Sequence, residues 1–209
     1  MAGAVAALGL TAYAHVAAAG PVDPAGDPVG GHTPLDARVW AMTGGTIMLA
    51  MACLWVAYSL ARVDPTRSAA ARVLSVAGAL GLLLTAVFPA GAAPGPTPAG
   101  GEIHSWSAAV VFTALPCAGW MLGRRFRSPA LSALSVLSVA LLAVFLATRP
   151  GSPVADLIGG SDYHGLVERL LLPAGAALVF LAARSTGTLP GSNKGDISRL
   201  PTPALPTLT

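Results

Sequence analysis

Charged side chains are scarce in this chain of 209 residues, where Asp, Glu, Lys and Arg together make up only 10%. A soluble domain carries about 25% charged residues. Hydrophobic residues reach 54% instead, and the mean hydropathy is +0.69. A chain with so little charge cannot cover a water-facing surface, so we expect it to lie in lipid.

Cysteine and aromatic residues are also scarce. Cys53 and Cys117 are the only cysteines, and both fall within apolar segments, where a thiol usually packs as a small hydrophobic group. The pI is about 9.3, but the basic residues form no dense run, and aromatic residues make up only 6% of the chain. We therefore expect no nucleic-acid partner, and we expect membrane lipid as the main contact.

Long apolar runs are what the chain has in quantity. A membrane-spanning helix needs about 20 apolar residues, and lipid favours helices because it offers the backbone no hydrogen-bond partners. We predict an all-α, polytopic membrane bundle of six transmembrane helices. The predicted spans are about 2–19, 39–61, 70–90, 104–122, 130–147 and 166–183, followed by a disordered cytoplasmic tail over 185–209. For the first span the alternative is a signal peptide cleaved after Ala17 or Ala19, but no Lys or Arg lies near Met1.

Basic residues predict the orientation of these spans. Nine of the twelve Lys and Arg residues fall on one side of the predicted membrane. They are Arg62, Arg67, Arg72, Arg124, Arg125, Arg127, Arg184, Lys194 and Arg199. Because cytoplasmic loops carry an excess of Lys and Arg, we expect this side and both termini to be cytoplasmic, in the plasma membrane. The outer loops are longer, and the Gly- and Pro-rich run from Gly91 to Gly101 is not expected to continue a helix.

Groups that can transfer a proton gather on the predicted outer side. This side holds all four histidines and seven of the nine acidic residues. Glu168 and Arg169 stand just after the start of the last span, where opposite charges are costly unless paired or hydrated. His164 lies four residues before Glu168, which places both on one helix face. With His104 at the start of the fourth span, we predict Glu168, His104 and His164 as catalytic residues.

Three further residues complete the predicted site. Arg169, Trp106 and Asp36 are the predicted substrate-binding residues, with Arg169 as a clamp for an anionic group. The candidate metal ligands are His15, His32, His104 and His164. The chain contains no HExxH, HxxxH or CxxC motif. The only argument for a divalent metal is therefore that these histidines lie on the same predicted side of the membrane, and the identity of any cofactor is left open. Without a GxSxG motif, an activated water is the expected nucleophile in any hydrolysis.

Several short motifs resemble the DUF998 family of small polytopic membrane proteins. They are Val39-Trp40-Ala41-Met42, Phe88-Pro89, Gly101-Glu102-Ile103-His104, Arg124-Arg125 and Gly165-Leu166-Val167-Glu168-Arg169. The resemblance covers roughly residues 20–184. The first outer loop departs from the family pattern, because Thr33 and Asp36 stand where a Ser-Asp pair is common. The resemblance implies a membrane fold and points to His104, Glu168 and Arg169, but it implies no reaction.

Three functions fit these residues. The first is an enzyme that acts on a lipid or isoprenoid substrate at the outer leaflet, by acid/base or metal-assisted chemistry, as a lipid hydrolase or an isoprenoid cyclase would. The second is a non-catalytic accessory or assembly protein, in which Glu168 and Arg169 hold the bundle together. The third is a small transporter. It ranks last because charged residues in mid-membrane, which coupled carriers use, are nearly absent.

Overall fold

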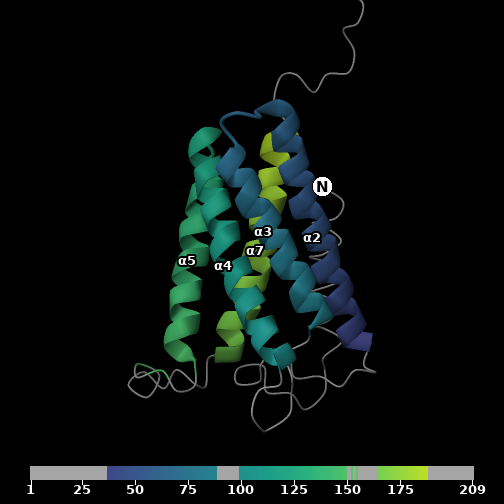
Figure 1. Ribbon diagram of the computed structural model, residues 1–209. Coiled ribbons are helices and arrows are strands. Elements are labelled where there is room, and N and C mark those ends of the chain that lie inside the picture. Colours follow the sequence, from purple (N-terminus) through teal and green to yellow (C-terminus); the bar gives the residue numbers. More distant parts are fainter. Residues whose placement is uncertain (1–36, 89–98, 150–151, 153, 155–163, 188–209) are drawn as a thin grey trace, which may run out of the picture.

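The computed structural model describes residues 37–88, 99–149, 152, 154 and 164–187. Within these residues the chain is helical, without strands, and its five helices stand side by side (Figure 1). They are α2 (Ala37–Val63), α3 (Ala69–Val87), α4 (Ala99–Arg125), α5 (Pro129–Thr148) and α7 (His164–Gly187). Each is long and apolar enough to cross a membrane. The predicted first span and residues 188–209 of the predicted tail lie outside the described residues.

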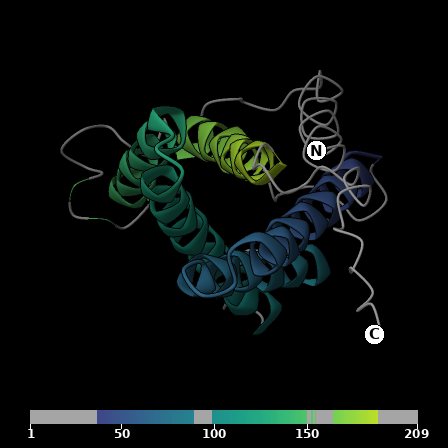
Figure 2. The ribbon, with the colours of Figure 1, turned by 90° about the horizontal axis from the view of Figure 1, so that it is seen from above.

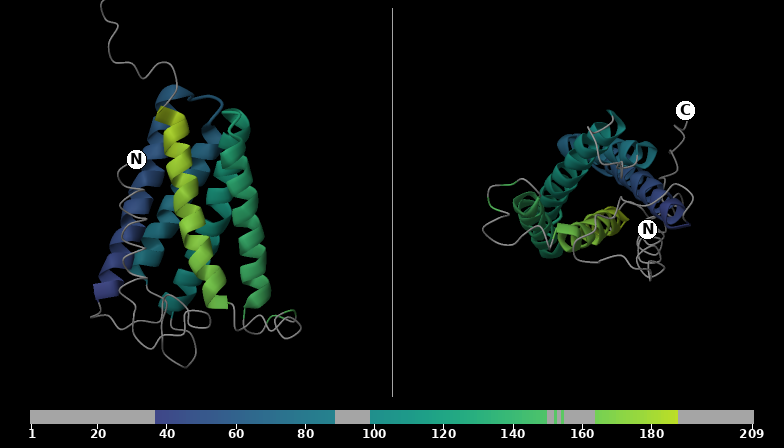
Figure 3. Two further views of the ribbon diagram at one scale, coloured as in Figure 1. Left: turned by 180° about the vertical axis from the view of Figure 1, so that it is seen from behind. Right: turned by 90° about the horizontal axis from the view of Figure 1, so that it is seen from below.

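The helices form a ring in which neighbours along the chain are also neighbours in space. α3 packs between α2 and α4, α5 packs against α4 and α7, and α7 returns to contact α2. Figures 2 and 3 show this arrangement along the bundle axis and from behind. α4 also contacts α7 across the ring. Polar groups at the starts of α4 and α7 are therefore carried by helices that touch.

Successive helices run in opposite directions, so the bundle has two unlike ends (Figure 1). We call one the basic end. It holds the α2–α3 connection (64–68), the α4–α5 connection (126–128) and the last turn of α7. We call the other the histidine end, because α4 and α7 begin there and carry His104 and His164. Seven arginines lie at or near the basic end: Arg62, Arg67, Arg72, Arg124, Arg125, Arg127 and Arg184.

Glycines allow close helix approach in the middle of the bundle. A Cβ at Gly81 of α3 would lie 2.9 Å from the Ser107 carbonyl oxygen of α4. A Cβ at Gly119 of α4 would lie 2.6 Å from the Ser135 hydroxyl of α5 and 2.8 Å from Leu178 of α7. Because lipid does not drive apolar side chains together, membrane helices rely on such close packing. α4 thus packs closely against α3, α5 and α7 at positions where a side chain larger than glycine would clash.

Buried serines bring hydroxyl groups into this core without leaving them unpaired. Ser75, Ser135 and Ser138 are buried, and each hydroxyl donates to the backbone carbonyl four residues earlier in its own helix. Such local bonds satisfy a hydroxyl where no water is present. Large apolar side chains such as Trp55 and Leu80 are exposed instead, on the surface that lipid covers in a membrane-spanning bundle.

Several helix ends differ from the predicted spans. α4 begins at Ala99 rather than at His104, so Gly100 and Gly101 are helical, although the run ending there was expected to break a helix. Glycine is only about 1 kcal/mol less favourable than alanine in a helix. α3 ends at Val87 rather than Ala90, because Phe88 leaves the helical conformation at φ −111° and ψ 87°.

The last helix is longer than its predicted span. α7 continues to Gly187 through Ser185 and Thr186, which were assigned to the disordered tail. The Ser185 hydroxyl donates to the Leu181 carbonyl at 2.9 Å, and the Thr186 hydroxyl donates to the Ala183 carbonyl at 3.0 Å. These bonds keep polar residues within the final turn, which composition alone did not indicate.

Candidate functional site

His104 lies in the second turn of α4 at the histidine end and is half-buried. Its Nδ1 is 2.8 Å from the Phe88 carbonyl oxygen at the end of α3. The last carbonyls of a helix have no partner within the helix, and the following Pro89 has no N–H. Because a carbonyl only accepts, Nδ1 must carry the hydrogen. In the neutral ring, Nε2 then holds the lone pair, ready to accept a proton or bind a metal.

Glu168 and Arg169 lie in the second turn of α7, at the same end of the bundle. Both side chains are half-buried, and both have interaction partners, as charged groups at this depth require. α7 contacts α4. The structure therefore brings His104, Glu168 and Arg169 to one end of the bundle, on two helices that touch.

The remaining predicted site residues are spread more widely. Trp106 is 75% exposed on the outer surface of α4. His164 is the first residue of α7, but its side chain is not described, and Asp36, His15 and His32 lie outside the described residues. Among the side chains that are described, no three His, Cys, Asp or Glu are grouped to hold a metal ion. A divalent metal involving His15, His32 and His164 stays a prediction.

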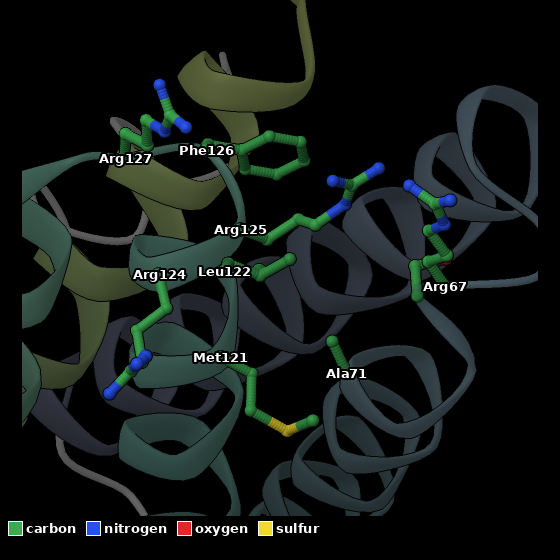
Figure 4. A pocket seen from close by; sticks show the side chains of 9 residues that line it. Arg67, Ala71, Met121, Leu122, Arg124, Arg125, Phe126 and Arg127 are labelled. Carbon is green, nitrogen blue, oxygen red and sulfur yellow. The ribbon is translucent and has the colours of Figure 1, made fainter.

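The basic end contains a cavity of about 440 Å³, which sequence reasoning missed. Figure 4 shows the side chains around it, which come from the start of α3, the end of α4 and the connections beside them. Arginines supply most of its charge: Arg67, Arg124, Arg125 and Arg127. Ala71, Met121, Leu122 and Phe126 supply apolar surface. The sequence signal is the run Arg124-Arg125-Phe126-Arg127, whose arginines also indicate the orientation of the spans.

An ion pair fixes one wall of this cavity. Nε and Nη2 of Arg125 each lie 2.9 Å from Asp64 Oδ2, and the Arg67 backbone N–H donates to Asp64 Oδ1 at 3.3 Å. The Arg125 hydrogen bond is the main reason that the pKa of Asp64 lies below its ordinary value of 3.8. Asp64 thereby ties the α2–α3 connection to the end of α4.

The α4–α5 connection turns sharply at the other wall. The Ser128 N–H donates to the Gly123 carbonyl at 2.8 Å, and Arg127 adopts φ 51°. This is the hydrogen bond of a Schellman motif, whose left-handed position is usually glycine. The Ser128 hydroxyl then accepts from the Leu131 N–H at 3.4 Å, with Pro129 next to this cap, as helix starts favour. The sequence places an arginine where the backbone favours glycine.

Comparison with known proteins supplies a family and no activity. The family model described as "Protein of unknown function (DUF998)" matches residues 1–185. Searches of curated proteins and of solved structures gave no match.

Proposed function

The chain belongs to the DUF998 family of proteins of unknown function, and we propose that it is a plasma-membrane enzyme with a His/carboxylate site at the outer leaflet. In this proposal six helices cross the membrane, and both termini are cytoplasmic. The substrate is a lipid or an isoprenoid, and the reaction proceeds by general acid/base chemistry at His104 and Glu168.

The contact between His104 Nδ1 and the Phe88 carbonyl, at 2.8 Å, carries this proposal. It fixes the orientation of the ring and assigns the lone pair to Nε2, as in histidines that act as bases or metal ligands. Glu168 on the adjacent α7 is the second proton-transfer group. Arg169 beside it binds an anionic substrate group, and the exposed ring of Trp106 faces the surface from which an apolar substrate approaches.

A metal-assisted version of the same chemistry uses the same nitrogen. A metal-bound histidine usually donates its other ring N–H to a carbonyl or carboxylate, and the Phe88 carbonyl supplies that acceptor. His15, His32 and His164 are the further candidate ligands. A bound divalent ion would activate a water or polarise a substrate oxygen.

A single substitution separates catalysis from support of the fold. In His104→Asn, the amide nitrogen takes the place of Nδ1 and keeps a donor for the Phe88 carbonyl, but no base remains. We expect this variant to fold like wild type and to lose at least about 100-fold in turnover, as general-base removal does. The assay is mass spectrometry of a panel of glycerophospholipids and polyprenyl lipids incubated with the protein in nanodiscs. Ser105→Ala is the control, because Ser105 is exposed and bonds only to the Gly101 carbonyl of its own helix.

A non-catalytic accessory role is the second candidate, and the same contact favours it. The His104 side chain connects the start of α4 to the end of α3, and a residue with a purely structural role would make the same contact. This role predicts that His104→Asn retains function and that His104→Ala loses thermal stability. Full turnover by both His104→Asn and Glu168→Gln on a lipid that the wild type converts would exclude the catalytic proposal.

A further inference from the structure

We propose that the cavity at the basic end binds the phosphate group of an anionic membrane lipid. This site is separate from the histidine end and does not depend on the proposed function. Its volume of about 440 Å³ lies within the range of about 300–1,000 Å³ that is typical of small-molecule sites.

Charge is the first argument for an anionic ligand. Four arginines line the cavity, and among the described residues the one ion pair at its wall joins Arg125 to Asp64. Figure 4 shows Arg67, from the α2–α3 connection, and Arg125, from α4, directed to the same side, whereas Arg124 is directed to the opposite side. A phosphate neutralises positive charge of this kind and can accept paired N–H bonds from a guanidinium group.

The backbone around the cavity is also suited to an anion. The first turn of α3 borders the cavity through Ser68 and Ala71, and among the described residues no acidic side chain lies in that turn. The Ser68 hydroxyl donates backward to the carbonyls of Leu60 and Asp64 rather than capping the helix. The N–H groups of this turn and the positive end of the helix dipole therefore favour a nearby negative charge.

The apolar part of the lining indicates a lipid rather than free phosphate. Met121 is 41% exposed and lies on α4 next to Trp120, which is also 41% exposed. Met121 therefore belongs both to the cavity lining and to the exposed apolar surface of α4. A lipid satisfies both parts, with its phosphate among the arginines and its first acyl carbons against Met121.

The backbone at Arg127 is consistent with a binding role. The left-handed conformation, at φ 51°, is unfavourable for residues other than glycine. Such strain is often kept where a side chain serves a site. A glycine would make the same turn, but it would remove one of the four cations.

The test is a titration of the detergent-solubilised full chain with short-chain phosphatidylglycerol, followed by native mass spectrometry. Detergent removes the charged bilayer surface, so only lipid held in a site is counted. We expect saturable binding of one phosphatidylglycerol and at least about tenfold weaker binding of phosphatidylcholine, because its cationic choline opposes the arginines. Arg67→Gln/Arg127→Gln should weaken phosphatidylglycerol binding about 25-fold, at about fivefold for each arginine.

The matched control is Arg62→Gln/Arg184→Gln, which removes two exposed arginines near the same end that do not line the cavity. This pair should change the affinity less than about threefold, well below the loss at the cavity. Equal losses in both pairs would show a diffuse basic surface and would overturn the proposal. Equal binding of phosphatidylcholine would also overturn it.

Two further experiments distinguish a lipid from free phosphate as the ligand and provide a variant that is expected to fold. Inorganic phosphate should compete only weakly, and competition as strong as that of the lipid would overturn the assignment to a lipid. Arg127→Gly keeps the turn and should weaken phosphatidylglycerol binding about fivefold. If this folded variant binds phosphatidylglycerol as tightly as wild type, the proposed placement of the phosphate in this cavity is wrong.

Discussion

The two ends of the bundle differ in how their polar groups are held. At the basic end, connections of a few residues fix the charges through backbone bonds and one ion pair, as at Asp64 and Ser128. At the histidine end, the candidate groups lie in the second turns of α4 and α7, and the His104 side chain contacts the Phe88 carbonyl at the end of α3. The residues that suggest proton transfer therefore lie at one end, and the best-defined cavity lies at the other.

This difference is the basis for proposing two separate sites, one at each end of the bundle. The small residues at Gly81 and Gly119 bring the helices into close contact between the two ends, and a cavity of only about 20 Å³ lies in the core beside Cys53 and Leu178. A space of that size holds about one water molecule. Among the described helices, the middle of the bundle between the two ends is therefore closely packed.

A matched pair of core substitutions should separate the two ends with the largest effect. Leu60 near the basic end is 0% exposed, and Leu171 near the histidine end is 1% exposed. Replacing either with alanine leaves a cavity, and we expect a loss of about 2 kcal/mol, the low end for such changes because the unfolded helices remain in lipid. The measurement is reversible unfolding in mixed micelles.

The readouts at the two ends should then diverge. Leu60→Ala should weaken phosphatidylglycerol binding at the basic end while leaving the lipid conversion assigned to His104 nearly unchanged, and Leu171→Ala should do the reverse. Because α2 contacts α7, we expect each variant to have a smaller effect on the readout at the opposite end. If either variant impaired phosphatidylglycerol binding and lipid conversion equally, the two ends would form one unit.

Arg127→Gly should have the next largest effect on stability, and in the opposite direction. Relief of the left-handed conformation contributes about 1–2 kcal/mol, and the extra flexibility of glycine in the unfolded chain offsets roughly 0.5–1 kcal/mol. We expect the variant to be as stable as wild type or about 1 kcal/mol more stable in the same unfolding assay. Arg124→Gly is the control, because Arg124 lies within α4 and should lose about 1 kcal/mol. A clear loss at Arg127→Gly would mean that the side chain itself stabilises the turn.

The sequence was sufficient to predict the helices, but not the contacts between residues that define the sites. Long apolar runs were enough to predict α2, α3, α4, α5 and α7, because the length and composition of a span depend on neighbouring residues only. The Asp64–Arg125 pair joins residues 61 positions apart, and Arg125 lines the cavity. The tautomer of His104 depends on the Phe88 carbonyl, which lies 16 positions away in the sequence. Interactions of this kind require the packed backbone.

Asp64→Asn should have the smallest effect, and it acts on the basic end alone. The folded-state pKa of Asp64 lies below its ordinary value of 3.8, chiefly because Arg125 donates to the carboxylate. A lowered pKa contributes stability above the ordinary value, and this contribution is lost as the pH falls through the folded-state pKa. Wild type should therefore lose more stability than Asp64→Asn as the pH falls from about 5 toward 3. The measurement is the melting temperature across this range, with salt expected to reduce the difference because Arg125 is 44% exposed.

The same variant also tests whether the ion pair shapes the cavity. Asp64→Asn adds one net positive charge to the basic end, which by itself favours an anionic lipid, but it releases Arg125 from its fixed position. If charge alone governs binding, phosphatidylglycerol affinity should rise at neutral pH. If the geometry set by Asp64 governs it, affinity should fall, because a mobile guanidinium group must be ordered again each time the lipid binds. We expect a fall, since Asp64 holds the Arg125 guanidinium group in place before any ligand arrives.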